Sequence, residues 1–215
     1  MDRKLIIEKL KELDQYTKNF VQTYDLIVVL KQVDLNSLQG VLNGILLLPH
    51  ETKYDLKICA FVSPIMAETA KKVVDRVITP TELEKYKNEN EAKKLAKEYD
   101  IFIAQQDVMP QIARLFGKIL GPRKKMPNPK TGGIFTQNSD LNTLVSNLKR
   151  TQLIQIKDQP QIQLSVGHEK MTPEEIAENI NVALNHIISH LPGGKSNVKK
   201  VYIKKTMSPL IELSV

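Results

Sequence analysis

The sequence contains one cysteine and no apolar run that approaches the length of a membrane-spanning helix. Because Cys59 has no second cysteine to pair with, a disulfide framework and a zinc knuckle are excluded. The first residues, Met1 to Lys4, lead into an amphipathic pattern instead of the apolar core of a signal peptide. These absences predict a cytoplasmic protein that makes no contact with a membrane.

The motifs of common enzymes are also missing. Gly117 and Gly121 flank a lysine, but no Gly-Lys-Ser/Thr follows a strand, which argues against a nucleotide-binding phosphate loop. No nucleophile elbow is present, and Cys59 lies in an apolar strand where we expect a buried, inert thiol. His186 and His190 are four residues apart on a predicted helix, but without further ligands two surface histidines are favoured over a metal site. We therefore predict no catalytic residue, cofactor or metal, and a small α/β enzyme stays open only by analogy of fold.

Positive charge is concentrated in the middle of the chain, which carries a net charge of +7. Residues 1–64 hold eight basic and eight acidic side chains, and residues 158–215 hold six of each. Residues 65–157 hold seventeen basic against ten acidic side chains, so the whole excess lies there. Such a balance favours an acidic partner, and without membrane signals that partner is expected to be nucleic acid. The uneven distribution indicates two bodies with different roles.

The loop Leu120–Lys130 is the most informative segment of the sequence. Its three prolines fix φ and remove backbone donors, so it is neither helix nor a good strand. Four of its eleven side chains are cationic and none is acidic. A stiff basic loop offers charge without a pocket, which suits a polyanion better than a small substrate. A solvated loop is the alternative.

Hydrophobic periodicity separates the chain ends from the middle. Near the ends, amphipathic helices are predicted at 4–18 and at 173–191, the second with Thr172 as N-cap and Glu175 closing a capping box. The predicted strands of these parts are 25–30, 44–48, 56–62, 161–166, 198–207 and 210–215. The middle alternates helices at 65–74, 91–98, 107–120 and 140–148 with strands at 100–104 and 152–156. This alternation predicts a parallel sheet.

We therefore predict a two-domain α+β protein with a nested architecture. Residues 1–64 and 158–215 would form a terminal domain, a two-layer α/β sandwich built from both chain ends. Residues 65–157 would form an inserted, Rossmann-like α/β domain of parallel strands. The two crossings, near Pro64 and near Pro160, are expected to act as hinges.

A second basic cluster lies near the C-terminus and comprises Lys195, Lys199, Lys200, Lys204 and Lys205. In a strand, Lys200, Tyr202 and Lys204 share one face, while Lys199, Val201, Ile203 and Lys205 share the other. An aromatic ring between lysines suits stacking on a base or ribose beside phosphate contacts. The alternative is a solvated strand protected by gatekeeping lysines.

Several motifs carry a family resemblance. Leu120–Gly132 and the ending Tyr202–Pro209 resemble the signature loop and the RNA-binding turn of the L-one family of large-subunit ribosomal proteins, the family of the mobile lateral stalk. Further matches in the same order are Asn19-Phe20-x-Gln22, Leu48-Pro49-His50, Ala104–Pro110 and Val166–Met171. They cover nearly the whole chain, and their character is archaeal.

The resemblance implies the same nested fold and a function without catalysis. The protein would bind large-subunit ribosomal RNA, form the lateral stalk as a monomer within the ribosome, and assist release of deacylated tRNA from the exit site. It would also bind its own messenger and repress translation. The alternative is an RNA-binding translational regulator that acts outside the ribosome.

The resemblance also implies which residues touch RNA. On the terminal domain these are Phe20, Gln22, Lys31, Gly167, His168, Lys204, Thr206, Met207 and Ser208. Auxiliary charge would come from the basic loop, through Arg123, Lys124, Lys125 and Lys130. Because the terminal domain is net neutral, it would read RNA through hydrogen bonds and close approach, while the inserted domain supplies salt-dependent attraction.

The chain departs from the family pattern at four places. Ser208 and Lys124 replace glycines, and Val21 stands where archaeal members usually have threonine. After His50 the usual glycine- and arginine-rich turn is replaced by Glu51-Thr52-Lys53. A missing glycine at 208 would limit how closely the backbone approaches RNA.

Overall fold

The computed structural model describes residues 2–35, 38, 42–137, 139–156 and 158–213, except for the side chains of Lys87 and Lys130. The chain divides into two compact units. The terminal unit consists of Met1–Tyr54 and Arg150–Val215, and the inserted unit consists of Asp55–Lys149. Within the described residues, no helix combines the length and apolar character needed to cross a membrane.

Both boundaries between the two units lie about ten residues earlier in the chain than the sequence predicts. The sequence predicts strand β3 (Ile58–Phe61) as part of the terminal domain. In the structure this strand pairs with β5 (Ile101–Gln105) in the inserted unit. The sequence predicts strand β7 (Thr151–Ile154) as part of the inserted domain. In the structure this strand pairs with β2 (Gly44–Leu47) in the terminal unit. A short apolar run predicts a strand without identifying its partner, so the pattern left both affiliations undetermined.

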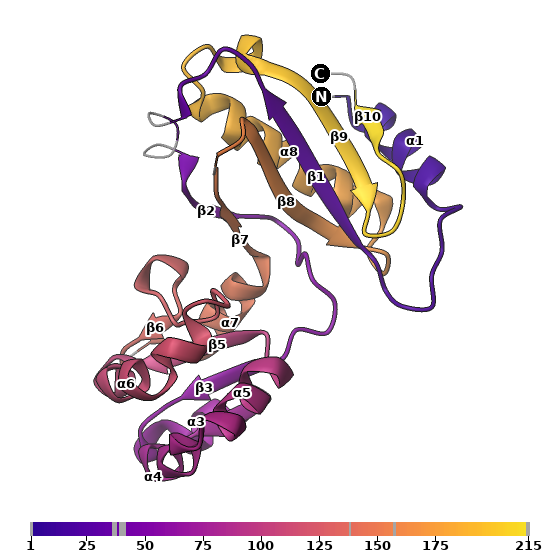
Figure 1. Cartoon of the computed structure of the whole chain (residues 1–215). Coiled ribbons are helices and arrows are strands. Elements are labelled where there is room, and N and C mark those ends of the chain that lie inside the picture. Colours follow the sequence, from indigo (N-terminus) through magenta and orange to yellow (C-terminus); the bar gives the residue numbers. More distant parts are fainter. Residues whose placement is uncertain (1, 36–37, 39–41, 138, 157, 214–215) are drawn as a thin grey trace. The chain divides into compact units, whose positions relative to one another are not determined.

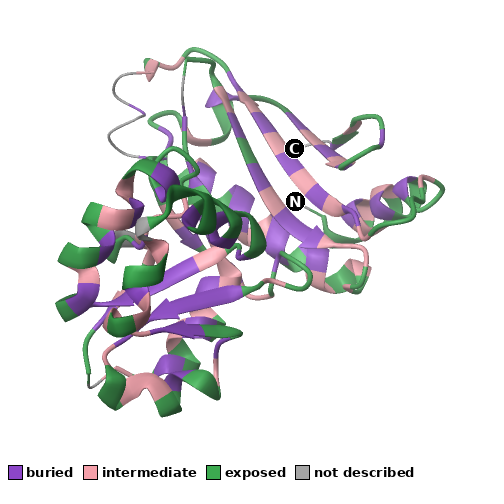
Figure 2. Cartoon of the chain, turned by 60° about the horizontal axis from the view of Figure 1, so that its bottom comes forward, coloured by how far each residue is buried: buried purple, intermediate pink, exposed green. Residues whose placement is uncertain are grey.

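The terminal unit is built on a four-stranded antiparallel sheet with the order β10-β9-β1-β8. Its strands are β1 (Thr23–Leu30), β8 (Gln161–His168), β9 (Val198–Lys205) and β10 (Ile211–Leu213). Helices α1 (Arg3–Leu13) and α8 (Pro173–His190) pack on one face of the sheet (Figure 1). Figure 2 shows the resulting alternation of buried and half-buried residues along these strands. This alternation in burial corresponds to one covered face and one open face of the sheet.

Helix α8 begins and ends where the sequence predicts. The Thr172 side chain accepts a hydrogen bond from the Glu175 backbone, and the Glu175 carboxylate accepts one from the Thr172 N–H, which forms the capping box. The helix ends at His190, before Leu191. Helix α1 is shorter than predicted and ends at Leu13, the last position of its apolar pattern.

The inserted unit contains a parallel sheet with the order β4-β3-β5-β6, where β4 is Arg76–Ile78 and β6 is Ile134–Phe135. One face carries α3 (Ala67–Lys71) and α7 (Leu141–Arg150). The other face carries α4 (Pro80–Leu83), α5 (Glu89–Glu98) and α6 (Met109–Leu120). Strand β3 is buried along its whole length, as expected for a strand with helices on both sides. The predicted fold class is confirmed, although the helix expected at 65–74 is a 3-10 turn, Pro64–Met66, followed by the short α3.

Candidate nucleic-acid interface

Three distant segments of the terminal unit meet where β9 ends and β1 begins. The Thr206 N–H donates to the Thr23 carbonyl at 3.1 Å, and the two hydroxyls lie 3.1 Å apart. On the other side of β1, Thr23 pairs with His168 of β8. Thr206, Met207 and the Gly167-His168 pair therefore gather at one end of the sheet, which we call the exposed end, and Phe20 belongs to the segment that leads into β1 there.

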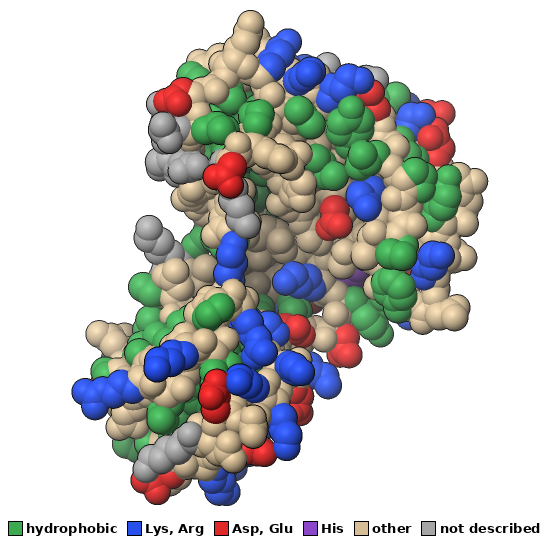
Figure 3. Space-filling view, in the orientation of Figure 1, with side chains coloured by type: hydrophobic (Ala, Val, Ile, Leu, Met, Phe, Trp, Pro, Cys, Tyr) green, Lys and Arg blue, Asp and Glu red, His purple; other side chains and the backbone are tan. Residues whose placement is uncertain are grey.

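Large apolar side chains are open to solvent at the exposed end. Phe20 is 53% exposed and Met207 is 60% exposed. Figure 3 shows hydrophobic side chains over this part of the terminal unit, whereas Lys and Arg are more frequent on the inserted unit. Clustered exposed apolar groups mark interaction surfaces in soluble proteins. The exposed end thus combines exposed apolar groups with hydrogen-bonding groups.

Gln22 lies beneath the exposed end and is completely buried. Its amide Nε2 donates to the Tyr16 carbonyl at 2.8 Å and to Glu169 Oε1 at 3.0 Å. Its Oε1 accepts from the Met207 N–H at 3.0 Å. The resemblance implied that Gln22 touches RNA, but its side chain has no exposed surface for such a contact. Its role is to position the Met207 backbone.

Lys205 completes this buried network, although the sequence placed it only in a basic cluster. It is 2% exposed, and its Nζ lies 3.1 Å from Glu169 Oε1 and 3.4 Å from Asp14 Oδ1. The same ammonium lies 5.4 Å from the centre of the Tyr24 ring. The sequence contains a signal for the burial of Lys205, because the alternation of side chains along β9 places it on the same face as the buried Val201 and Ile203.

Glu169 connects Lys205 to Gln22. Burial alone would raise the pKa of Glu169, but the N–H of Gln22 and the ammonium of Lys205 outweigh burial and lower that pKa below its ordinary value. The carboxylate is therefore charged at neutral pH and accepts hydrogen bonds from Gln22 N and Nε2. A partly buried ion pair thus supports the turn that carries Thr206 and Met207.

Ser208 closes the same turn. Its hydroxyl accepts from the Lys205 N–H at 2.8 Å and donates to the Pro209 carbonyl at 2.9 Å. Ser208 is 9% exposed and does not have a positive φ, so its backbone does not require glycine. The hydroxyl points into the protein and leaves the outer side of the turn open, contrary to the effect expected from the sequence.

Gly167 and His168 differ in what they contribute to the exposed end. A Cβ at Gly167 would lie 2.9 Å from Ile176 and 3.1 Å from Met171, so this glycine permits close packing on α8. Burial lowers the pKa of His168, and the nearby carboxylates Glu51 and Glu175 oppose that shift. Its Nδ1 accepts from the Lys170 N–H at 3.2 Å, in keeping with a neutral ring.

Of the other two predicted contacts of the terminal unit, Lys31 lies away from the exposed end, whereas Lys204 lies beside it, two residues before Thr206. Lys31 follows the far end of β1, about 25 Å from Thr23 for a strand of this length. Lys204 lies on the open face, where its register partner is Asp25. On the same face Lys200 pairs with Glu212 at 2.8 Å. The open face is therefore balanced in charge and lacks the uniform basic character that the sequence suggested.

The basic loop of the inserted unit contains both structural and outward-facing cations. Lys125 Nζ donates to the Ala96 carbonyl at 3.1 Å and to the Tyr99 carbonyl at 2.7 Å, and so caps the C-terminus of α5. Lys124 has a φ of 56°, the left-handed region in which the family has glycine. Arg123 is exposed. The Lys130 side chain lies outside the described residues.

The residues considered for catalysis or metal binding do not form such a site. His186 and His190 stack with ring centres 4.4 Å apart, and no metal-binding group of three ligands occurs among the described residues. Cys59 is buried, and burial raises the pKa of its thiol. At the crevice between the ends of β3 and β5, buried Gln105 accepts from the Ser63 N–H at 2.8 Å and bridges the two strands.

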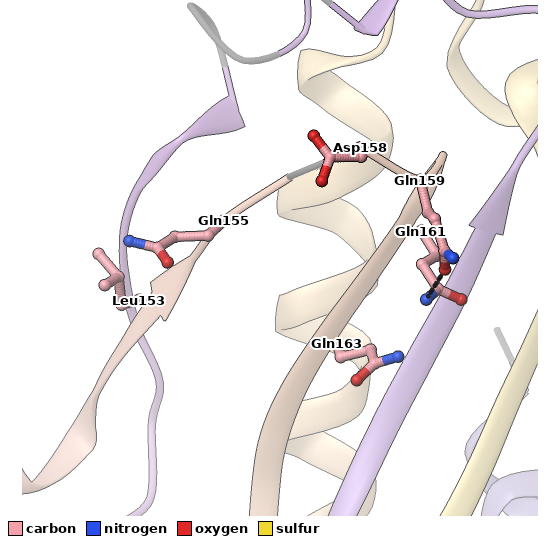
Figure 4. Close-up of a pocket in the computed structure, with 6 residues that line it drawn as sticks. All are labelled: Leu153, Gln155, Asp158, Gln159, Gln161 and Gln163. Carbon is pink, nitrogen blue, oxygen red and sulfur yellow. Dashed lines mark hydrogen bonds between the residues drawn. The ribbon is translucent and has the colours of Figure 1, made fainter. Parts of the chain in front are cut away.

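One polar hollow lies at the opposite end of the terminal sheet from the exposed end. Its volume is about 410 Å³, and its described lining consists of Leu153, Gln155, Asp158, Gln159, Gln161 and Gln163 (Figure 4). The Gln161 amide donates to Gln159 at 2.7 Å across the rim. No basic side chain belongs to this described lining, so it offers no attraction to phosphate.

The fold and the exposed end define a two-unit α/β protein with a candidate binding surface at one end of its terminal sheet. The model of the ribosomal protein L1p/L10e family matches residues 10–209. The chain is similar to the large ribosomal subunit protein uL1 of Pyrococcus abyssi, with 42% identity over 99% of this chain and 96% of the relative. It is 39% and 36% identical, with the same coverage, to the uL1 proteins of Pyrococcus horikoshii and Methanocaldococcus jannaschii. The chain therefore belongs to the ribosomal protein L1p/L10e family.

Family membership confirms the resemblance found in the sequence, including its archaeal character. The relatives are ribosomal proteins and not enzymes, in agreement with the prediction that the chain has no catalytic role.

Proposed function

We propose that this protein is a structural component of the large ribosomal subunit and binds large-subunit ribosomal RNA through the exposed end. The observation that carries the proposal is that Thr206 and Met207 are held by hydrogen bonds to the segment that also carries the exposed Phe20. RNA is commonly recognised by shape, 2′-hydroxyls and stacking, and a surface that combines exposed apolar side chains with hydrogen-bonding groups suits this mode. The names of the archaeal relatives, all large-subunit proteins, agree with it.

The inserted unit supplies the electrostatic part of binding in this proposal. Arg123 and Lys124 belong to an exposed, proline-stiffened loop, and Figure 3 shows many cations on the same unit. Such contacts attract phosphate without reading sequence. The bound protein forms the lateral stalk, assists release of deacylated tRNA from the exit site, and represses its own messenger.

The specific-site part of the proposal is tested with Thr206→Ala and Met207→Ala. Each variant is expected to weaken binding to the stalk-junction RNA much more than binding to a random duplex, because only the first ligand matches the exposed end. Affinities are measured at one fixed salt concentration. Equal losses on both RNAs would contradict a specific site.

The ribosomal part is tested by sedimentation. In a sucrose gradient the protein is expected to travel with large subunits through moderate salt. A protein that remains at the top of the gradient while it still binds junction RNA would indicate a regulator acting outside the ribosome.

A further inference from the structure

Tyr54 is a large aromatic side chain beside the exposed end, and the family resemblance assigns it no role. It is 51% exposed. Its ring lies 5.6 Å from the His168 ring, centre to centre, in an edge-on arrangement with an interplanar angle of 62°. The Lys170 ammonium lies 5.4 Å from the centre of the Tyr54 ring. An aromatic ring, an imidazole and a cation thus form one group, which we call the Tyr54 platform.

The segment that carries Tyr54 is held firmly by the terminal unit. The N–H of His50 donates to the Asn179 side chain at 3.0 Å, and Asn179 in turn donates to the carbonyls of His50 and Val166. Thr52 is fully buried and its hydroxyl accepts from the Gln152 side chain. These contacts anchor the chain just before Tyr54. The hydrogen bonds of this segment therefore fix the position of the exposed Tyr54 ring before any ligand binds, as preorganised binding requires.

The Tyr54 platform continues the row of groups at the exposed end. Thr206 hydrogen bonds to Thr23, Thr23 pairs with His168, and the His168 ring contacts Tyr54. Adjacent strands lie about 4.8 Å apart, so the row extends over only a few strand widths. A ligand that contacts Thr206 and extends along this row reaches Tyr54.

We propose that the Tyr54 platform stacks an unpaired base of the RNA that the exposed end binds, an inference that rests on the proposed function. Unpaired bases stack on aromatic rings regardless of their identity, because every base has a π-face. The Lys170 ammonium lies over one face of the ring, where it contacts the phosphate of the same nucleotide, and the base stacks on the other face. A phosphate alone would need no aromatic ring, and a duplex would have no free base to offer. The ligand class is therefore a junction or loop with a splayed-out nucleotide.

The chain offers a direct optical test because it contains no tryptophan. The Tyr54→Trp variant carries the only indole, and stacking of a base on it is expected to quench its fluorescence when junction RNA with unpaired nucleotides is added. The control variant is Ile65→Trp, whose side chain is 83% exposed on the inserted unit. Its fluorescence is expected to change little. Unquenched Tyr54→Trp fluorescence in the RNA-bound protein would overturn the platform.

Affinity gives a second, independent test. Tyr54→Ala is expected to weaken binding to that junction RNA by about tenfold, and Tyr54→Phe is expected to bind like the wild type, since stacking needs the ring and not the hydroxyl. Junction RNA whose unpaired nucleotides are removed should bind both variants equally. The matched control is Leu210→Ala, which removes another exposed apolar side chain of the terminal unit.

The outcomes separate the platform from the proposed function. If Thr206→Ala loses specific binding while Tyr54→Ala binds like the wild type, the platform is refuted and the RNA function stands. If the wild-type chain does not distinguish junction RNA from random duplex, both inferences fail. Because Tyr54 is half exposed, its variants are expected to fold, and circular dichroism verifies this.

Discussion

Lys205 and Glu169 form an ion pair of 3.1 Å beneath the turn that carries Thr206 and Met207. The lysine is almost inaccessible to solvent. The glutamate also accepts a hydrogen bond from the side-chain amide of Gln22, and the oxygen of that amide accepts one from the Met207 N–H. The residues that we propose to touch RNA and the residues that set their position are therefore different sets. The second set is buried, so its loss affects folding and binding together.

Removing the charge of Lys205 is expected to destabilise the terminal unit strongly. Lys205→Met leaves Glu169 and Asp14 without their shared cation, and breaking such a buried pair costs about 3 kcal/mol. Urea denaturation measures the loss. The control is Lys200→Met, whose ion pair with Glu212 is exposed and contributes less than about 1 kcal/mol. Similar losses for both variants would mean that Lys205 has no special structural role.

Acid is expected to weaken the same pair. The pKa of Glu169 is lowered from its ordinary value of 4.5 in the folded state. A group with a depressed folded pKa stabilises the fold above its unfolded pKa, and this contribution is lost as the pH falls through the folded pKa. The free energy of unfolding of the wild type should therefore drop more below pH 4.5 than that of Glu169→Gln. Parallel pH curves for the two proteins would argue against the pair as the cause.

Ser208→Gly tests the role of the serine that replaces a family glycine. The change removes two hydrogen bonds of the turn, to the Lys205 N–H and to the Pro209 carbonyl, and is expected to cost about 1 kcal/mol of stability. RNA affinity should remain close to that of the wild type, because the hydroxyl points inward. Tighter RNA binding by the glycine variant would show that the serine obstructs the ligand.

Local signals predicted the elements better than they predicted the site. Helix α8 was predictable because Thr172 and Glu175 form its cap within four residues, and β1 because Leu26–Leu30 is a short β-rich apolar run bounded by polar residues. The burial of Gln22 was not predictable, since its partner Glu169 is 147 residues away. The same holds for Lys125, whose ammonium reaches carbonyls of α5. The burial of such a cation or amide cannot be predicted locally, because its partners are distant in the sequence.

Lys124→Gly is expected to stabilise the inserted unit. Lys124 has a φ of 56°, and a residue with a Cβ loses about 1–2 kcal/mol in this region relative to glycine. Part of that gain is offset by the greater freedom of glycine in the unfolded chain, which leaves a net gain of about 0.5–1 kcal/mol. Thermal denaturation measures the change. Arg123→Gly is the control, because Arg123 does not have a positive φ, and it is expected to lower the stability.

The two cations Arg123 and Lys125 are expected to respond in opposite ways to neutralisation. Arg123→Ala should reduce the slope of log affinity against log salt by about one, as for the loss of one phosphate contact, and leave the stability unchanged. Lys125→Ala should leave that slope unchanged and lower the stability, because the Lys125 ammonium caps α5. Salt titrations of RNA binding measure the slope for each variant, and thermal denaturation measures the stability of each. If Lys125→Ala changed the salt slope and Arg123→Ala did not, the basic loop would contact RNA through the face that the structure turns toward α5.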